Sequence, residues 1–216
     1  MPAHMPEIHA YILRQIVEGD LRPGDLIDEA AIAQVFNVSK TPIREAILQL
    51  EANRIVEKKP RAGASVTTLE PEELIELIEL HSELEGAAAY HAARRATPSQ
   101  LENLQRVASA YADRLSQGST GQSSAYSLNL AFHLAVFTCC NNATLRHALD
   151  MTGVRLVAYF RAQEGLRTGE GRAFAEHAEI TRAICEGRAD DARRAMRLHA
   201  EISSDTLLDV LSLMKT

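Results

Sequence analysis

The chain has 216 residues, of which 46% are hydrophobic and 24% are charged, and its formal net charge at pH 7 is −6. This length suits two small domains, and the composition is too apolar for a disordered protein. No apolar run approaches the roughly 20 residues that span a bilayer, and residues 1–15 lack the basic end and the apolar centre of a signal peptide, so we expect a cytoplasmic protein without a membrane partner.

The first predicted elements are two helices. Apolar residues recur at helical spacing over residues 6–18, which predicts the first helix. Asp28 is placed to cap a second helix over residues 29–36. Asn37 should end that helix, because asparagine tolerates the left-handed conformation better than most residues.

A third helix and a hairpin complete the N-terminal region. The helix is predicted over residues 39–53, with Ser39 or Thr41 as its cap and Pro42 in the first turn, where a missing N–H does no harm. Residues 55–69 then contain two short β-branched stretches around a tip of Lys, Pro, Arg and Gly, which predicts a β-hairpin wing.

The pattern of two closely spaced helices is typical of a helix-turn-helix. Its tight turn needs a small residue in the first helix, a residue that tolerates positive φ at the turn, and an apolar residue that packs the second helix against the first. These residues are Ala33, Asn37 and Ile43, respectively. The second helix of such a pair lies in the major groove of DNA, with its N-terminal residues toward the bases. We therefore expect a DNA-binding surface made by the following residues: Ser39, Lys40, Thr41, Arg44, and Arg61 and Gly63 of the wing.

Local charge supports this interpretation although the net charge is negative. The stretch from Lys40 to Arg61 holds six basic residues against three acidic ones, a local charge of +3. Arg44 is suited to a bidentate contact with guanine, and Arg61 to the minor groove or a phosphate. The alternative is that these side chains are simply solvated charges on a small domain.

Beyond residue 69 the sequence predicts only helices. They are expected over residues 71–96, 99–117, 125–140, 143–164, 170–187 and 189–214, with a loop at residues 118–124. The predicted fold class is therefore mainly α, with a winged helix-turn-helix of three helices and a β-hairpin wing over residues 1–69. An all-α antiparallel bundle of about six helices follows over residues 70–216. The cysteines at positions 139, 140 and 185 lack ligand-like spacing and are interpreted as small buried residues.

Four residues of the second region are candidate metal ligands. Asn129 and His133 are four residues apart and so share a helix face, and His177 and His199 are flanked by apolar residues at helical spacing. Three inward-facing histidines on three helices suit a shared metal ion in a bundle core. The alternative is that they are packed core histidines with ordinary hydrogen-bond partners.

Residues 6–67 resemble the GntR family of bacterial regulators, most specifically in SKTPIREAI at residues 39–47. The resemblance implies two-fold dimers on short palindromic operators. In this chain Lys40 stands where arginine is usual, Asn37 where glycine is common, and Asn53-Arg54 replaces a pair that usually ends in glycine. The lysine is expected to shift operator preference, and the other differences to affect turn geometry.

Residues 72–205 resemble the FCD domain of the FadR subfamily, in which an Asp-xxx-His pair and two later histidines bind a divalent metal that faces the effector. The resemblance implies that Asn129, His133, His177 and His199 bind the metal, with zinc or nickel favoured. Asn129 replaces the usual aspartate, which removes a negative charge. His81 stands where an arginine often holds the effector carboxylate. We therefore add His81 and, as a second base, Arg155 to the candidate effector site.

The leading hypothesis is a homodimeric repressor whose binding to operator DNA is controlled by a small metabolite, an organic acid, bound next to the metal. A metal-dependent enzyme is the alternative, because three histidines with an open position activate water. Glu176 and Glu179 flank His177, but both are expected to point away from the histidines, which leaves no general base. A third hypothesis is a metal-storage or structural dimer that does not bind DNA.

Overall fold

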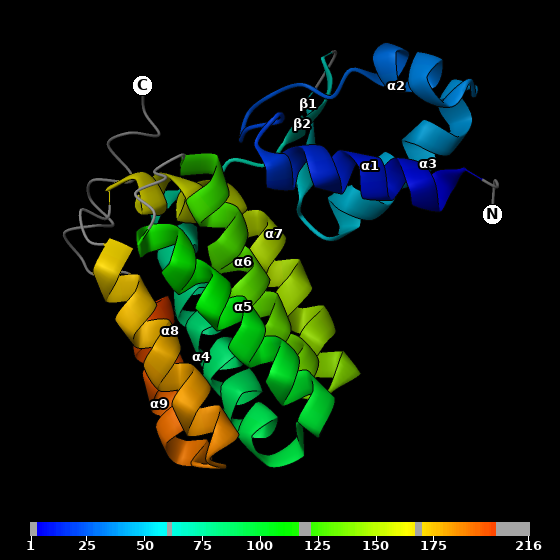
Figure 1. Ribbon diagram of the computed structural model, residues 1–216. Helices are drawn as coiled ribbons and strands as arrows, with labels where there is room; N and C mark the ends of the chain where they lie inside the picture. The colour runs from blue at the N-terminus through cyan, green and yellow to red at the C-terminus, as the bar shows by residue number, and fades with distance from the viewer. Residues whose placement is uncertain (1–3, 60–61, 117–121, 167–169, 202–216) are drawn as a thin grey trace. The chain divides into compact units, whose positions relative to one another are not determined.

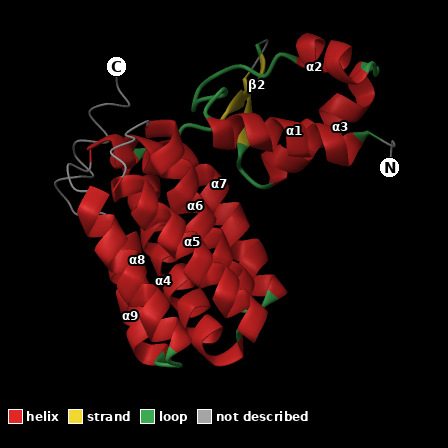
Figure 2. Cartoon of the chain, viewed as in Figure 1, coloured by secondary structure: helices red, strands yellow, loops and turns green. Residues whose placement is uncertain are grey.

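The computed structural model describes residues 4–59, 62–116, 122–166 and 170–201 (Figure 1). These residues form nine helices and one two-stranded antiparallel sheet (Figure 2). The mainly α fold class is thereby confirmed. None of the described helices is both long and apolar enough to cross a lipid bilayer.

The chain divides into two compact units. The first consists of Met1–Leu74 together with Met151–Ala158, and the second of Ile75–Asp150 together with Tyr159–Thr216. The N-terminal helices and the sheet thus belong to the first unit, together with a short stretch of a later helix. The expected domain boundary between residues 69 and 70 stays a prediction.

Three helices begin the first unit: α1 (Met5–Glu18), α2 (Glu29–Phe36) and α3 (Lys40–Ala52). Both α1 and α2 pack against α3. Ile8 and Ile12 of α1 and Ile43 and Leu50 of α3 are fully buried. Burying a side chain of this size stabilises the fold by about 1.5–3 kcal/mol, so this core fixes α3 on one side and leaves its other side to solvent.

The turn between α2 and α3 has the predicted chemistry. The Asp28 carboxylate accepts hydrogen bonds from the backbone N–H groups of Ala30 and Ala31, both at 2.9 Å. Asn37 ends α2 in the left-handed conformation, with φ of 50°. Ser39 occupies the residue before α3 with an extended backbone, but its hydroxyl makes no capping hydrogen bond. The position of this cap is therefore as predicted, whereas its side-chain interaction is absent.

The wing is a hairpin of two strands: β1 (Val56–Lys59) and β2 (Gly63–Val66). Val56 pairs with Val66 and Lys59 with Gly63, and residues 60 and 61 between them lie outside the described part. Arg54, just before the hairpin, has φ of 56°. This is the position where the resemblance placed a glycine, and here an arginine adopts the left-handed conformation.

Six further helices form the bundle in Figure 1: α4 (Pro71–Arg95), α5 (Pro98–Ser116), α6 (Gln122–Cys139), α7 (Ala143–Leu166), α8 (Glu170–Cys185) and α9 (Ala189–Ala200). Two predicted boundaries were wrong. α6 begins at Gln122, inside the predicted loop of residues 118–124. α9 ends at Ala200 because the backbone of Glu201 is extended, and residues 202–214 of the longer predicted helix lie outside the described part.

The core of the second unit brings α4, α6, α8 and α9 together. Within it α5 packs against α6 and α8, and α8 packs against α9. Gly86 of α4 lies so close to α9 that a Cβ atom there would be 3.2 Å from the backbone oxygen of Arg193. Phe132 of α6 and Ile180 of α8 are fully buried in the same core. Cys139 and Cys140 are buried as predicted, whereas Cys185 is only partly buried. Because α4, α6, α8 and α9 share this core, polar side chains that face it from these helices lie close to one another.

Candidate DNA-binding surface and metal centre

The N-terminal turn of α3 presents the predicted DNA-binding residues to solvent. Ser39, Lys40, Thr41 and Arg44 are all exposed. The side chain of Arg44 is 67% exposed, and its Nε atom lies 3.6 Å from the carboxylate of Glu29. At this exposure the ion pair is weak, so Arg44 is available for another partner.

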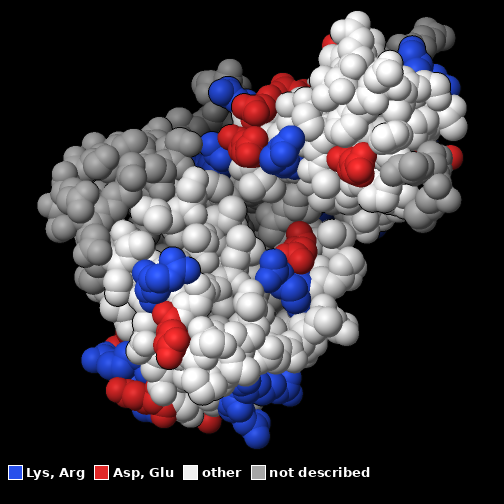
Figure 3. All heavy atoms as spheres, turned by 45° about the vertical axis from the view of Figure 1, so that its right-hand side comes forward, with Lys and Arg blue, Asp and Glu red and all other residues white. Residues whose placement is uncertain are grey.

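The wing carries Gly63 at an exposed position, with φ of 99°. Apart from its chain neighbours, no atom of the described residues lies within 4 Å of where a Cβ would stand. Arg61 lies outside the described residues. Lys58 pairs with Glu51 at 2.8 Å and Lys59 with Glu57 at 2.6 Å. On the face drawn in Figure 3, basic and acidic side chains of the described residues are likewise interspersed. The charges of the two wing lysines, Lys58 and Lys59, are therefore compensated by neighbouring carboxylates.

The three candidate histidines converge in the core of the second unit, from α6, α8 and α9. Nε2 of His199 lies 3.0 Å from Nε2 of His177 and 3.2 Å from Nε2 of His133. His177 is fully buried and His199 is 5% exposed, and the side chain of His133 is 12% exposed. The His177 ring stacks on Phe132, with 3.8 Å between the ring centroids. The predicted convergence of these histidines is confirmed.

Two glutamates, which the sequence did not predict, lie on the other sides of the imidazole rings. Nδ1 of His199 donates a hydrogen bond to Oε2 of Glu176 at 2.8 Å. Nδ1 of His133 lies 3.0 Å from Oε1 of Glu85, a close contact that is not aligned as a hydrogen bond. The expectation that Glu176 points away from the histidines was wrong, because its side chain reaches from α8 to the adjacent helix α9.

The electrostatics favour a charged Glu85 and a neutral His199. Burial raises the pKa of Glu85, but the opposing effect of His133 and His81 is larger, and the pKa falls below its usual range. Burial lowers the pKa of His199, and the hydrogen bond to Glu176 opposes this only in part. A neutral imidazole is the form of histidine that binds metal ions.

The hydrogen bond to Glu176 leaves the lone pair of His199 at the centre of the cluster. A neutral imidazole has one N–H group and one lone pair. Because Nδ1 of His199 donates to Glu176, its Nε2 atom is an acceptor, and it lies 3.0 Å from Nε2 of His177 and 3.2 Å from Nε2 of His133. This lone pair can bind an N–H group of a neighbouring imidazole or a cation. Three imidazole nitrogens that meet in one place form a donor set that fits a divalent metal ion.

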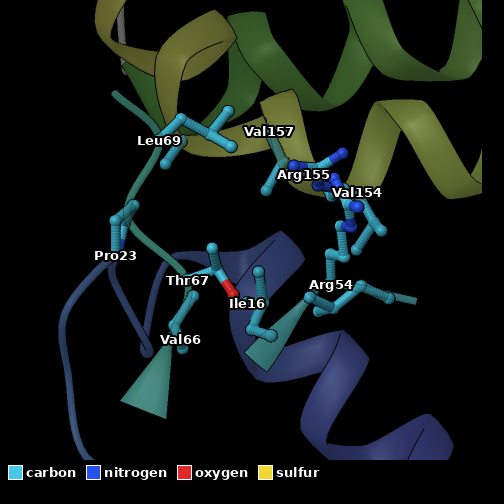
Figure 4. A pocket seen from close by; sticks show the side chains of 11 residues that line it. Ile16, Pro23, Arg54, Val66, Thr67, Leu69, Val154, Arg155 and Val157 are labelled. Atoms are coloured by element: carbon cyan, nitrogen blue, oxygen red, sulfur yellow. The ribbon is translucent and has the colours of Figure 1, made fainter. Parts of the chain in front are cut away.

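The other predicted site residues are divided between two places. His81 is 4% exposed and lies 3.2 Å from Oε1 of Glu85, next to the histidines. Asn129 lies one turn before His133 on α6, and its Oδ1 atom is buried without a hydrogen-bond partner. Arg155 pairs with Glu73 and lines a small pocket of the first unit with Arg54 (Figure 4). Among the contacts of the described residues, none joins Arg155 to the histidines.

The sequence pattern that indicates Glu85 is its spacing from His81. His81 and Glu85 are four residues apart, and at that spacing two helical side chains meet on one face. For Glu176 no such pattern exists, since its partner is 23 residues later in the chain.

A helix-turn-helix with a hairpin wing, followed by a helical unit with a buried histidine cluster, is typical of transcriptional regulators of the winged helix-turn-helix class. The profile of the bacterial regulatory proteins of the gntR family matches residues 6–66, and that of the FCD domain matches residues 76–201. The chain therefore belongs to the GntR family and carries an FCD domain.

Relatives across nearly the whole chain support this assignment. The HTH-type transcriptional regulator LutR of Bacillus subtilis is 27% identical over 213 residues, which is 89% of this chain and 95% of that protein. A probable D-xylose utilization operon transcriptional repressor of Paenarthrobacter nicotinovorans is 25% identical over 199 residues, which is 89% of this chain and 84% of the repressor. The protein is thus a transcriptional regulator and not an enzyme.

Solved structures share the fold. McbR/YncC of E. coli superposes with a TM-score of 0.77 at 18% identity and covers 100% of this chain and 98% of its own. A putative GntR regulator from Rhodococcus sp. RHA1 gives 0.75 at 17% identity, over 97% of this chain and 98% of its own. Both similarities support an N-terminal winged helix-turn-helix followed by a helical domain.

Proposed function

We propose that this regulator is a cytoplasmic homodimeric repressor that binds a palindromic operator through α3 and the wing. A divalent metal in the FCD domain would hold an organic-acid effector, and effector binding would release the DNA. An effector acts in this way only if it binds one arrangement of the dimer better than the other.

The DNA contacts in this proposal come from Ser39, Lys40, Thr41 and Arg44, with Arg61 and Gly63 of the wing. The exposure of the α3 residues supports it, because the buried face of the same helix holds them on a fixed support. Selection from randomised duplex DNA should yield a palindrome whose half-sites lie about one helical turn apart. Binding should also fall steeply with salt, because phosphate contacts release counterions. Equal affinity for all sequences would contradict the proposal.

The metal proposal rests on one observation, the convergence of three Nε2 atoms. Two of the separations are 3.0 and 3.2 Å. Across a tetrahedral zinc with Zn–N bonds of about 2.0–2.1 Å, two nitrogens are about 3.3 Å apart. The ligands would be His133, His177 and His199, with Asn129 as a fourth through its buried, unpartnered Oδ1. The metal would supply an electrophilic position for an effector oxygen.

Elemental analysis of the purified full-length protein tests this part. We expect about one zinc or nickel per chain in the wild type and loss of the metal in His133→Ala and His177→Ala. His147→Ala is the matched control, because His147 is exposed on α7. Metal-free wild-type protein that takes up neither ion would refute the metal proposal and leave the DNA-binding proposal intact.

The effector proposal depends on the residues beside the histidines. His81 replaces the arginine that the resemblance implies and lies against the anionic Glu85, so it binds a carboxylate less strongly than a guanidinium does. The metal is then the main contact for an acidic group, and Arg155 would have to move from Glu73 to contribute. A panel of small organic acids, scored by release of the selected operator, should contain active compounds whose effect disappears in His133→Ala.

A further inference from the structure

Glu85 and Glu176 each lie beside the Nδ1 atom of a different histidine. Glu176 of α8 accepts the Nδ1 proton of His199 at 2.8 Å, and Glu85 of α4 lies 3.0 Å from Nδ1 of His133. In both cases the carboxylate is at the ring nitrogen remote from the place where the three Nε2 atoms meet. Neither glutamate is therefore positioned as a metal ligand itself.

The two carboxylates can also balance the charge of a bound divalent cation. Three neutral imidazoles and the amide of Asn129 carry no charge, so they leave a divalent cation unbalanced in a core where His177 is fully buried. An uncompensated buried charge is strongly unfavourable. Glu85 is 4% exposed and the side chain of Glu176 is 25% exposed, so their charges are only weakly screened by water.

We propose that Glu85 and Glu176 are positioning residues that orient His133 and His199 toward the metal and supply the negative charge that Asn129 lacks. This inference rests on the proposed metal function. A carboxylate on the second nitrogen of a ligating histidine fixes the tautomer and increases the basicity of the ligand, and its loss typically weakens metal binding about 10–100-fold. The two glutamates act on different histidines, so their contributions should be separable.

The chain offers a matched control for each residue. Glu83 is two positions before Glu85 on α4, but it is about half exposed and pairs with Arg197 at 3.0 Å. Glu179 is three positions after Glu176 on α8 and pairs with Arg182. Among the contacts of the described residues, neither of these glutamates pairs with a histidine.

The test is a competition titration of the metal-free, full-length protein with Zn²⁺ or Ni²⁺ against a chromophoric chelator. Glu85→Gln and Glu176→Gln should each bind the metal roughly 10–100-fold more weakly than the wild type, whereas Glu83→Gln and Glu179→Gln should stay within about twofold. Circular dichroism of the metal-free proteins establishes that each variant is folded.

A rescue separates a charge effect from a packing defect. Asn129→Asp restores a negative charge beside the metal, so it should tighten binding in the Glu85→Gln background by about tenfold or more. Failure of this rescue would overturn the charge part of the proposal. Wild-type affinity in both glutamine variants would overturn the whole inference while the metal function stood, and a wild type that binds no metal would overturn both.

Discussion

Glu176 and His199 are 23 positions apart in the chain, and their side chains meet in a hydrogen bond of 2.8 Å across the α8–α9 contact. The bond places the only proton of neutral His199 on Nδ1, so the lone pair of Nε2 faces the Nε2 atoms of His133 and His177. A cation bound among the three nitrogens would use this lone pair. This relationship links metal binding directly to the stability of the second unit.

Metal binding should stabilise the folded protein. A ligand that binds only the native state contributes about 2.7 kcal/mol when its free concentration is 100 times its Kd. We expect thermal unfolding of the metal-free wild type to move to higher temperature on addition of Zn²⁺ or Ni²⁺. The shift should vanish in His177→Ala and persist in His147→Ala. Equal shifts in the two variants would mean that the metal acts elsewhere.

The stability of the metal-free protein should decrease as the pH falls below about 6.5. Burial lowers the pKa of His199 from its model-compound value of 6.5, and the pKa values of His9 and His91 are shifted in the same direction. Below that value the unfolded chain binds protons that the folded protein does not take up, so the unfolded state is favoured. Urea unfolding at pH 7.5 and pH 5.5, in the presence of chelator, measures the difference. Equal unfolding free energies at the two pH values would contradict the expectation.

The local elements were predictable because their causes are local. Asp28 and Asn37 define the ends of α2 through their own side chain and backbone, and both behave as predicted. The wing followed from β-branched residues around a polar tip. By contrast, α6 begins at Gln122, because Gly and Ser residues weaken a helix without excluding it. Sequence patterns of this kind place helices well and their ends less well.

The residues of the candidate site were predictable only where side-chain spacing or the resemblance to a family indicated them. The three histidines were predicted in this way, but Glu176 was not. It precedes His177 and is turned away from it, so its relevance depends on which helix packs beside α8 and on the length of its side chain. That packing is a property of the tertiary structure. Arg155 was assigned to the effector site only because it lies in a central helix. That position does not indicate its partner, which is Glu73 and not a histidine of the cluster.

Arg44 is the side chain whose loss should most affect operator recognition. A good bidentate contact with guanine is worth about 1–3 kcal/mol of discrimination, so Arg44→Ala should weaken binding to the selected operator roughly tenfold to hundredfold. Its affinity for unrelated DNA should change much less. Fluorescence anisotropy at fixed salt measures both.

Arg14→Ala is the control for Arg44→Ala. Arg14 is also exposed, but it lies on α1, where its guanidinium covers the ring of Tyr11. Because Arg44 is 67% exposed, its removal should not disturb the fold. Wild-type affinity of Arg44→Ala for the operator would refute the assignment of α3 as the recognition helix.

Arg54→Gly should stabilise the first unit, although glycine usually destabilises. Arg54 has φ of 56°, a conformation that costs a residue with a Cβ about 1–2 kcal/mol and costs glycine little. The greater freedom of glycine in the unfolded chain offsets roughly 0.5–1 kcal/mol of this gain. The ion pair of Arg54 with Glu73, at 3.9 Å and with the arginine 77% exposed, adds little. We expect a net gain of about 0.5–1 kcal/mol in urea unfolding.

The same substitution inside a helix provides the contrast. Arg14 lies within α1, where the right-handed backbone suits any residue with a Cβ, and Arg14→Gly should cost about 1 kcal/mol. The two arginine-to-glycine variants should therefore move the unfolding midpoint in opposite directions. If both lower it by the same amount, the left-handed conformation of Arg54 stores no strain, and the arginine at this position is as well accommodated as a glycine.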